Sequence, residues 1–204
     1  MAATSNELCR AAERAAALAD GHTVAWQDAR GRRWRAEVPT AAQLRAYAPT
    51  LAAAYNEPAH AALLGNTEVF RADDVITHFA TMRGEGNVPV LVFVDDDFVG
   101  DADFRNFSLA CGHAEFAFLV AAPSAQGRGL GTEMARGLHR WAFATLGLQA
   151  VVASVAPENA ASLRVFAKLG YVSAPSAVRA VFAEVETDDV LCVTASEFAV
   201  VNAL

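Results

Sequence analysis

The stretch ProSerAlaGlnGlyArgGlyLeuGlyThr (Pro123–Thr132) decides the fold, because it joins an apolar strand to an amphipathic helix through closely spaced glycines. Glycines at 127, 129 and 131 let the backbone turn tightly and let a ligand approach without a Cβ in the way. The first turn of the following helix presents unpaired N–H groups and the positive end of the helix dipole. The turn therefore favours a phosphate or pyrophosphate, and Arg128 would add positive charge at its rim.

Three interpretations of this turn compete. A P-loop requires GxxxxGK[ST], and the turn has no lysine, so that class of site is excluded. A dinucleotide fingerprint requires GxGxxG and an acidic residue at the end of the next strand, whereas here the spacing is GxGxG and the strand ends at Val155 and Ala156. A nucleotide-dependent oxidoreductase is therefore the weaker alternative. The third interpretation is a glycine-rich connection without any ligand.

Hydropathy patterns around the turn predict a mixed α/β chain. Nearly continuous apolar runs predict strands at Val88–Val94, Phe98–Leu109, Glu115–Ala122 and Leu148–Val155. Helical spacing predicts helices at 129–146, ended by Gly147, and from Pro157 to Leu169, ended by Gly170. This order predicts an antiparallel meander that runs into a parallel β-α-β crossover.

The two ends of the chain complete this prediction. We expect a helix at 4–19, a hairpin at 23–39, a helix at 41–55 interrupted by Pro49, a helix at 72–83, and closing strands near 178–186 and 190–194. The prediction is a single compact domain overall. Within it, residues 1–40 form an N-terminal helix and hairpin extension, and residues 41–204 form the main domain.

Composition limits the kinds of partner. The chain has 204 residues, of which 54% are hydrophobic, and a net charge of −7, which argues against nucleic acid and anionic membranes as partners. Three widely separated cysteines predict neither a disulfide framework nor a zinc site, and the histidines have no metal-ligand spacing, so we expect no metal. The chain shows no signal-peptide pattern and no apolar run of the ~18–20 residues that a membrane helix needs. We expect a cytoplasmic protein.

Two segments carry a resemblance to a known family. GlnGlyArgGlyLeuGlyThr (126–132) resembles the acyl-CoA pyrophosphate loop Q/R-G-x-G-x-G/A of the GNAT N-acetyltransferases. AsnAlaAlaSerLeuArgValPheAlaLysLeuGlyTyr (159–171) is similar to the helix N-x-x-[AS]-x-x-x-[YF]-x-K-x-G-[FY] of that family. Residues 100–106 followed by 114–120 are similar to the branch that includes the ribosomal-protein N-terminal acetyltransferases. The resemblance covers about residues 88–172. It implies a mostly antiparallel central sheet flanked by helices, with the parallel crossover at the acyl-CoA site.

The resemblance also implies the cofactor, acetyl-CoA, and the residues that bind it. The pyrophosphate is implied to lie against Gln126, Gly127, Arg128, Gly129, Leu130, Gly131 and Thr132. The strand segment Leu119, Val120, Ala121 is implied to separate from its neighbour, to pair with pantetheine, and to direct an N–H at the thioester carbonyl. Asn159 and Phe166 are the other implied cofactor contacts. From the residues alone, Asn159 is equally well explained as a helix N-cap.

Acetylation of an amine needs a base, because an ammonium has no lone pair, and it benefits from an acid that protonates the leaving thiolate. Our first candidate for the base is Glu115, a lone carboxylate in an apolar run, and His113 is the second candidate. Many relatives have tyrosine where this chain has Phe166, which has no proton to give. Ser162, one turn earlier, is the nearest hydroxyl and our candidate acid, and water is the alternative.

The acceptor is expected to be a primary amine of a small molecule or of a protein N-terminus, acetylated directly without an acyl-enzyme. The expected lining of its cleft is Tyr55, Asn56, His60, Asn66 and Phe70, with a rim at Asp95–Asp97 or at Asp101 and Asp103 that would suit a cation. The alternative is an acyl-CoA-binding module without turnover, which Phe166 favours. A homodimer is left open.

Overall fold

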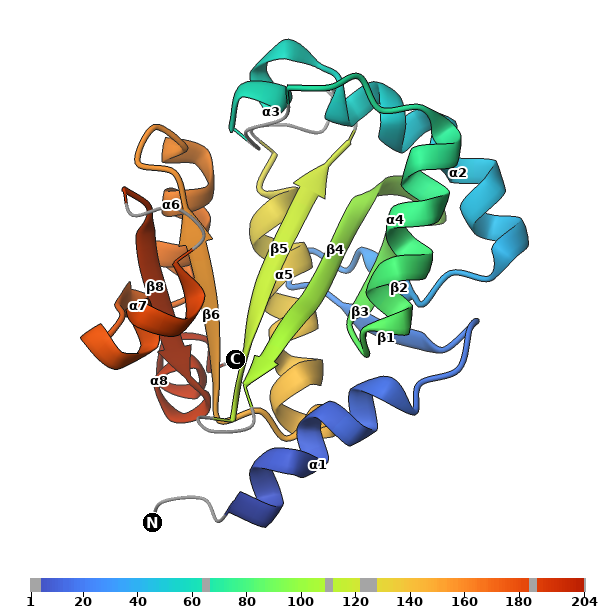
Figure 1. Ribbon diagram of the computed structural model, residues 1–204. Coiled ribbons are helices and arrows are strands. Elements are labelled where there is room, and N and C mark those ends of the chain that lie inside the picture. Colours follow the sequence, from blue (N-terminus) through green and yellow to red (C-terminus); the bar gives the residue numbers. More distant parts are fainter. Residues whose placement is uncertain (1–4, 64–66, 109–111, 122–127, 184–186, 204) are drawn as a thin grey trace.

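The computed structural model describes residues 5–63, 67–108, 112–121, 128–183 and 187–203. A central sheet runs through these residues in the strand order β1-β2-β3-β4-β5-β6-β8-β7 (Figure 1). The strands are β1 (Thr23–Gln27), β2 (Arg33–Glu37), β3 (Val88–Val94), β4 (Asp97–Ser108), β5 (His113–Val120), β6 (Ala150–Val155), β7 (Val172–Ser173) and β8 (Asp189–Thr194). Of the pairings in this sheet, β5 with β6 is parallel and the others are antiparallel. The predicted fold class is confirmed.

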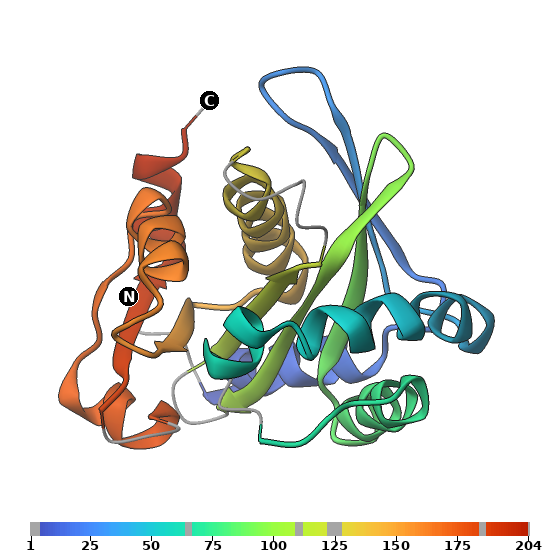
Figure 2. The same cartoon turned by 90° about the horizontal axis from the view of Figure 1, so that it is seen from above.

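Helices cover both faces of the sheet. They are α1 (Ser5–Ala16), α2 (Ala41–Tyr55), α3 (Pro58–Leu63), α4 (Ala72–Gly84), α5 (Leu130–Trp141) with the π-helical turn η2 (Ala142–Leu146), α6 (Ala160–Lys168), α7 (Ser176–Phe182) and α8 (Ala195–Val201). Figure 2 shows α2 and α4 on one face of β3–β5 and α5 on the other. Alternation along the strands explains the two layers: Leu91 and Phe93 pack under α2 and α4, whereas Phe104 and Phe116 pack with Met134 of α5.

Helix α2 is continuous, so the expected interruption at Pro49 is wrong. The side chains of Thr40 and Gln43 form a capping box at its start, and Pro49 lies inside the helix. Proline in a helix interior costs ~3 kcal/mol, because it removes a hydrogen bond and crowds the preceding turn. Ala48, Leu51 and Ala52 are buried on either side of it. Their packing outweighs the local cost.

The C-terminal region departs further from the prediction. Residues 178–182 belong to helix α7, so the strand expected there is wrong, whereas the strand expected at 190–194 is β8. Val178 and Phe182 are one helical turn apart and are both buried against Val152 and Val190. Helices α3 and α8 were not predicted. Helix α3 is short and buries none of its residues, so it has no hydropathy pattern that predicts a helix.

The N-terminal hairpin is continuous with the sheet. Trp34 of β2 pairs with Val94 of β3, and Trp26 of β1 stacks on Trp34. A Cβ on Gly137 of α5 would lie 2.0 Å from the Trp26 ring, so this glycine lets the hairpin close over the helix. The division of the chain at residue 40 stays a prediction.

Candidate active site

The site begins where β5 and β6 separate. Their parallel register joins His113 to Ala150 and ends, within the described strands, at Glu115 and Val152. On its other side β5 stays paired with β4 as far as Gly100 and Val120. Figure 1 shows β5 and β6 diverging beyond this short common segment. The sheet therefore opens along the second half of β5, in the region where the resemblance implied it.

The backbone of β5 is oriented toward this opening at alternate residues. The N–H of Ala121 donates to the carbonyl oxygen of Val99 at 2.8 Å, on the β4 side. In an antiparallel pair this orientation repeats every second residue, so the amides of Phe118 and Val120 point away from β4. Gly100 holds the two strands close: a Cβ there would lie 2.0 Å from the carbonyl oxygen of Leu119.

Two cavities flank the opening and meet at it. The larger has a volume of about 930 Å³ and the smaller about 500 Å³. Both are lined by Leu63, Phe118, Leu119, Asn159 and Ser162. A molecule in one cavity would therefore meet a molecule in the other beside Leu119 and Ser162.

The larger cavity contains groups that suit an anion. It is lined by Val120, Ala121, Gly129, Leu130, Gly131 and Thr132, which include the first turn of α5. Gly129 caps α5 in a left-handed conformation with φ of 78°, and a Cβ there would meet nothing within 4 Å. The N–H groups of a first helical turn have no partner inside the helix. Arg164 and Lys168, one turn apart on α6, add two positive charges to the same cavity, against one negative charge from Glu57.

Helix α6 places three predicted residues. The Oδ1 of Asn159 accepts from the N–H of Ser162 at 3.1 Å, so Asn159 is an N-cap, and it also lines both cavities. Ser162 lies at the junction of the cavities. Phe166 is buried, packs edge-on against Phe118 at 5.9 Å, and lines the smaller cavity.

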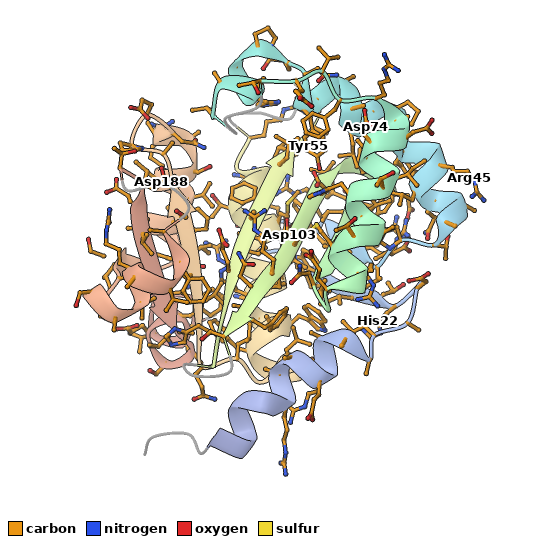
Figure 3. The ribbon with its side chains drawn as sticks, viewed as in Figure 1. His22, Arg45, Tyr55, Asp74, Asp103 and Asp188 are labelled. Carbon is orange, nitrogen blue, oxygen red and sulfur yellow. The ribbon has the colours of Figure 1, made fainter. Side chains whose placement is uncertain are left out.

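The smaller cavity is predominantly acidic. Asp101 and Asp103 lie on the same face of β4, and Glu158 and Asp188 approach from the β6 side. In Figure 3, Tyr55 and Asp103 lie over β4 and β5, and Asp188 lies on the other side of the opening. Arg105 lines the same cavity, and its Nε lies 3.7 Å from Asp103 Oδ1.

Asp101 is a buried carboxylate of this cavity whose pKa is shifted. The hydroxyl of Tyr55 donates to its Oδ2 at 2.5 Å. Burial raises the pKa of Asp101 to about 6, against the opposing effect of the Tyr55 hydrogen bond. The pKa of Tyr55 is raised well above its usual value by burial and by the neighbouring carboxylate, so Tyr55 remains a donor at working pH.

Glu115 and His113, the predicted bases, lie deeper in the sheet. Glu115 is 1% exposed; its Oε2 accepts from the Nδ2 of Asn106 at 2.7 Å, and Arg105 Nη2 lies 3.4 Å from its Oε1. Burial lowers the pKa of His113, whose ring lies near Phe182. Neither residue is among the described residues that line the two cavities. Their roles as base stay predictions.

Most of the expected acceptor-cleft residues come together. Tyr55 and Phe70 line the smaller cavity and His60 the larger. Asn56 holds the backbone of Phe70 through both its side-chain atoms, at 2.7 and 2.8 Å. Asp95 and Asp96 instead lie at the β3–β4 turn beside Arg33, and none of Asp95, Asp96 and Asp97 is among the described residues that line the two cavities, so the rim expected there is wrong. Asn66, Gln126 and Gly127 lie outside the described residues.

Sequence reasoning missed Arg164, Lys168 and Asp188 as lining residues. A signal existed for the first two, because a spacing of four puts both cations on one face of a helix that follows the glycine turn. No comparable signal marked Asp188, since its place depends on where β8 joins the sheet.

The structure bears on the expected absence of a metal site and of a membrane helix only for the residues that it describes. No group of three or more potential metal ligands occurs among the residues described. No helix in the described ranges is long and apolar enough to cross a membrane. Cys192 is a free, buried thiol.

Comparison with known proteins identifies the family. Residues 14–172 match the model of the acetyltransferase (GNAT) domain. The chain therefore belongs to the GNAT family of acetyltransferases, whose acyl donor is acetyl-CoA, and the resemblance seen in the sequence is confirmed. No curated protein is similar enough in sequence to count as a match.

Solved structures of low sequence identity share the fold. Spermidine N-acetyltransferase from Vibrio cholerae, in complex with CoA and spermine, is 16% identical with a TM-score of 0.64, covering 81% of this chain and 97% of its own. Aminoglycoside acetyltransferase AAC(6')-Ib, in complex with coenzyme A and kanamycin, is 16% identical with a TM-score of 0.66, covering 80% and 95%. RimJ from Mycobacterium smegmatis, in complex with CoA-disulfide, is 19% identical with a TM-score of 0.66, covering 87% and 89%.

Proposed function

We propose that the protein transfers the acetyl group of acetyl-CoA directly to a primary amine that carries positive charge, on a small molecule or at a protein N-terminus. The observation that carries this proposal is the pair of cavities of opposite charge that meet at Leu119 and Ser162. The cofactor is a polyanion and suits the cavity with Arg164 and Lys168. A cationic acceptor suits the cavity with Asp101, Asp103 and Asp188.

The residues of the larger cavity fit the cofactor. The amides of Gly129, Leu130, Gly131 and Thr132 would hold the pyrophosphate, with Arg128 at the rim. Of the predicted segment Leu119, Val120 and Ala121, the backbone of Val120 would pair with pantetheine, because the Ala121 N–H already donates to Val99 on the β4 side. Acetyl-CoA supplies an activated thioester carbonyl at this place.

The chain's own groups would then act on that carbonyl and on the acceptor. An N–H of Phe118 or Val120 would polarise the carbonyl oxygen, because both amides point into the opening. Ser162 is proposed as the proton donor to the leaving sulfur, since it lies at the junction of the cavities and Phe166 has no acidic proton. A cytoplasmic location and a homodimer stay predictions.

An acceptor panel tests this function. Release of free thiol from acetyl-CoA would be followed with spermidine, kanamycin and a short basic peptide, and with glutamate as an anionic amine. We expect turnover with one or more of the cationic amines and none with glutamate. Tight CoA binding without turnover on any amine would support a binding module. A thermal shift with nicotinamide nucleotides but none with CoA would favour an oxidoreductase.

A matched pair of variants tests the cofactor site. Gly129→Glu places a carboxylate in the open space against the pyrophosphate and should abolish CoA binding. Gly129→Asn is the control, because asparagine tolerates the left-handed conformation and carries no charge. We expect it to keep most of the CoA affinity measured by calorimetry. Equal affinities of the two variants would contradict the assigned site.

A further inference from the structure

Asp101 is a buried carboxylate beside the junction of the two cavities. It is 8% exposed, it lines the smaller cavity, and its register partner on β5 is Leu119, which lines both. Its Oδ2 accepts from Tyr55, whereas its Oδ1 has no hydrogen-bond partner within the described part of the chain. A buried polar atom without a partner is costly, and a donor on a bound ligand would remove that cost.

We propose that Asp101 is the general base of the acetyl transfer, and that its Oδ1 binds the ammonium group of the acceptor. This inference rests on the function proposed above. The Asp101 carboxylate takes one proton from the ammonium and becomes a carboxylic acid. The freed nitrogen lone pair forms the N–C bond as the C–S bond of the thioester breaks. The Ser162 hydroxyl gives a proton to the leaving sulfur and takes the second proton from that nitrogen, and Asp101 then returns its own proton to water.

The surroundings of Asp101 suit this role. A base works best when its pKa lies near the working pH, and burial brings that of Asp101 to about 6. Tyr55 on α2 is a positioning residue, because its hydroxyl fixes Oδ2 and leaves Oδ1 available. The other charged or titratable groups lining the cavity are Asp103 and Arg105 on β4, His78 on α4, and Glu158 and Asp188 near β6 and β8.

Glu115 is the competing candidate, and its contacts count against it. Both of its carboxylate oxygens already face donors on β4, from Asn106 and Arg105. It pairs with Val152 in the last register position before the strands separate, so it lies within the closed part of the sheet. Asp101 instead lies opposite Leu119, in the part of β5 where β6 is no longer paired.

The pH dependence of kcat/KM separates these residues. With acetyl-CoA and the amine turned over fastest in the panel, the wild-type value at pH 5 should be about tenfold below its plateau. This fall of kcat/KM toward low pH is the acidic limb of the profile. Asp101→Asn should lower kcat about 100-fold or more and remove the acidic limb. Tyr55→Phe should move the limb to higher pH, because the hydrogen bond that lowers the pKa of Asp101 is lost.

Two variants serve as comparisons. Asp97→Asn removes an exposed carboxylate from the same strand and should keep the wild-type profile. Glu115→Gln should keep the acidic limb, and CoA affinity confirms that each variant is folded. Wild-type kcat in Asp101→Asn, or loss of the limb in Glu115→Gln alone, overturns the inference while the proposed function stands. If no amine in the panel is acetylated, the proposed function fails, and the inference fails with it.

Discussion

Replacing Asp101 with asparagine should make the protein more stable at alkaline pH. Asparagine has the shape of aspartate and can still accept from the Tyr55 hydroxyl, but it removes a charge that is costly to bury. The pKa of this carboxyl is 3.8 in an unstructured chain and about 6 in the folded protein. Between these values the folded state holds more protons than the unfolded chain, so wild-type stability falls as the pH rises through this window.

The size of the effect follows from the same two values. A shift of about two pKa units corresponds to a penalty on the order of 3 kcal/mol at pH 8, where the group is ionised in both states. At pH 5 the folded group is mostly protonated, and the penalty is about half as large. Asp101→Asn should therefore gain stability at both pH values, and the gain should be about 1.5 kcal/mol larger at pH 8.

Urea unfolding of the wild type and Asp101→Asn at pH 5 and pH 8 measures this difference directly. Asp97→Asn, which changes an exposed carboxylate on the same strand, is the control and should show no such dependence. A gain that is the same at the two pH values would refute the reasoning, because the benefit would then not come from removing the charge. A loss of stability at pH 8 would refute it as well.

Three further changes test other parts of the structure. Gly100→Ala places a Cβ 2.0 Å from the Leu119 carbonyl oxygen, so we expect about 2–3 kcal/mol of destabilisation and a lower acetylation rate; Gly84→Ala, with nothing within 4 Å, is the control. Equal stability of those two variants in urea would contradict this. Tyr171→Phe removes the hydroxyl that lies 2.5 Å from the buried Nε2 of His139 and should cost about 1–3 kcal/mol in urea unfolding; an unchanged midpoint would show that the bond contributes nothing. Arg164→Ala with Lys168→Ala should weaken CoA binding more at low salt than at high salt, and a loss independent of salt in calorimetry would argue against a charge effect.

The sequence was sufficient for the parts of the fold that local patterns specify. Val88–Val94 was recognisable as a strand because it is almost uniformly apolar, as a strand buried on both faces is, and the predicted ends match the observed ones. Gly147 was recognisable as a helix end, and it takes a left-handed conformation there. The glycine turn marked the start of α5 for the same kind of reason.

Tertiary packing decided what local patterns could not. Val178 and Phe182 belong to α7 because both reach the same buried cluster, which no pattern in 178–186 revealed. Pro49 remains inside α2 because the buried residues around it offset its cost. In the candidate site, Asp101 is a better candidate for the base than Glu115 because it lies beside the separation of β5 and β6. This placement depends on the register of strand pairing, which local sequence patterns do not specify.

The separation of β5 and β6 leaves a sheet edge on each side of a gap inside the molecule. Unpaired edges of this kind can recruit other extended chains, and they make a protein prone to self-association. An elongated molecule lying along the gap would occupy the place of a missing strand. Coenzyme A held at 100 times its Kd would raise the free energy of unfolding by about 2.7 kcal/mol. Preparations saturated with coenzyme A should therefore aggregate more slowly on warming than preparations without it.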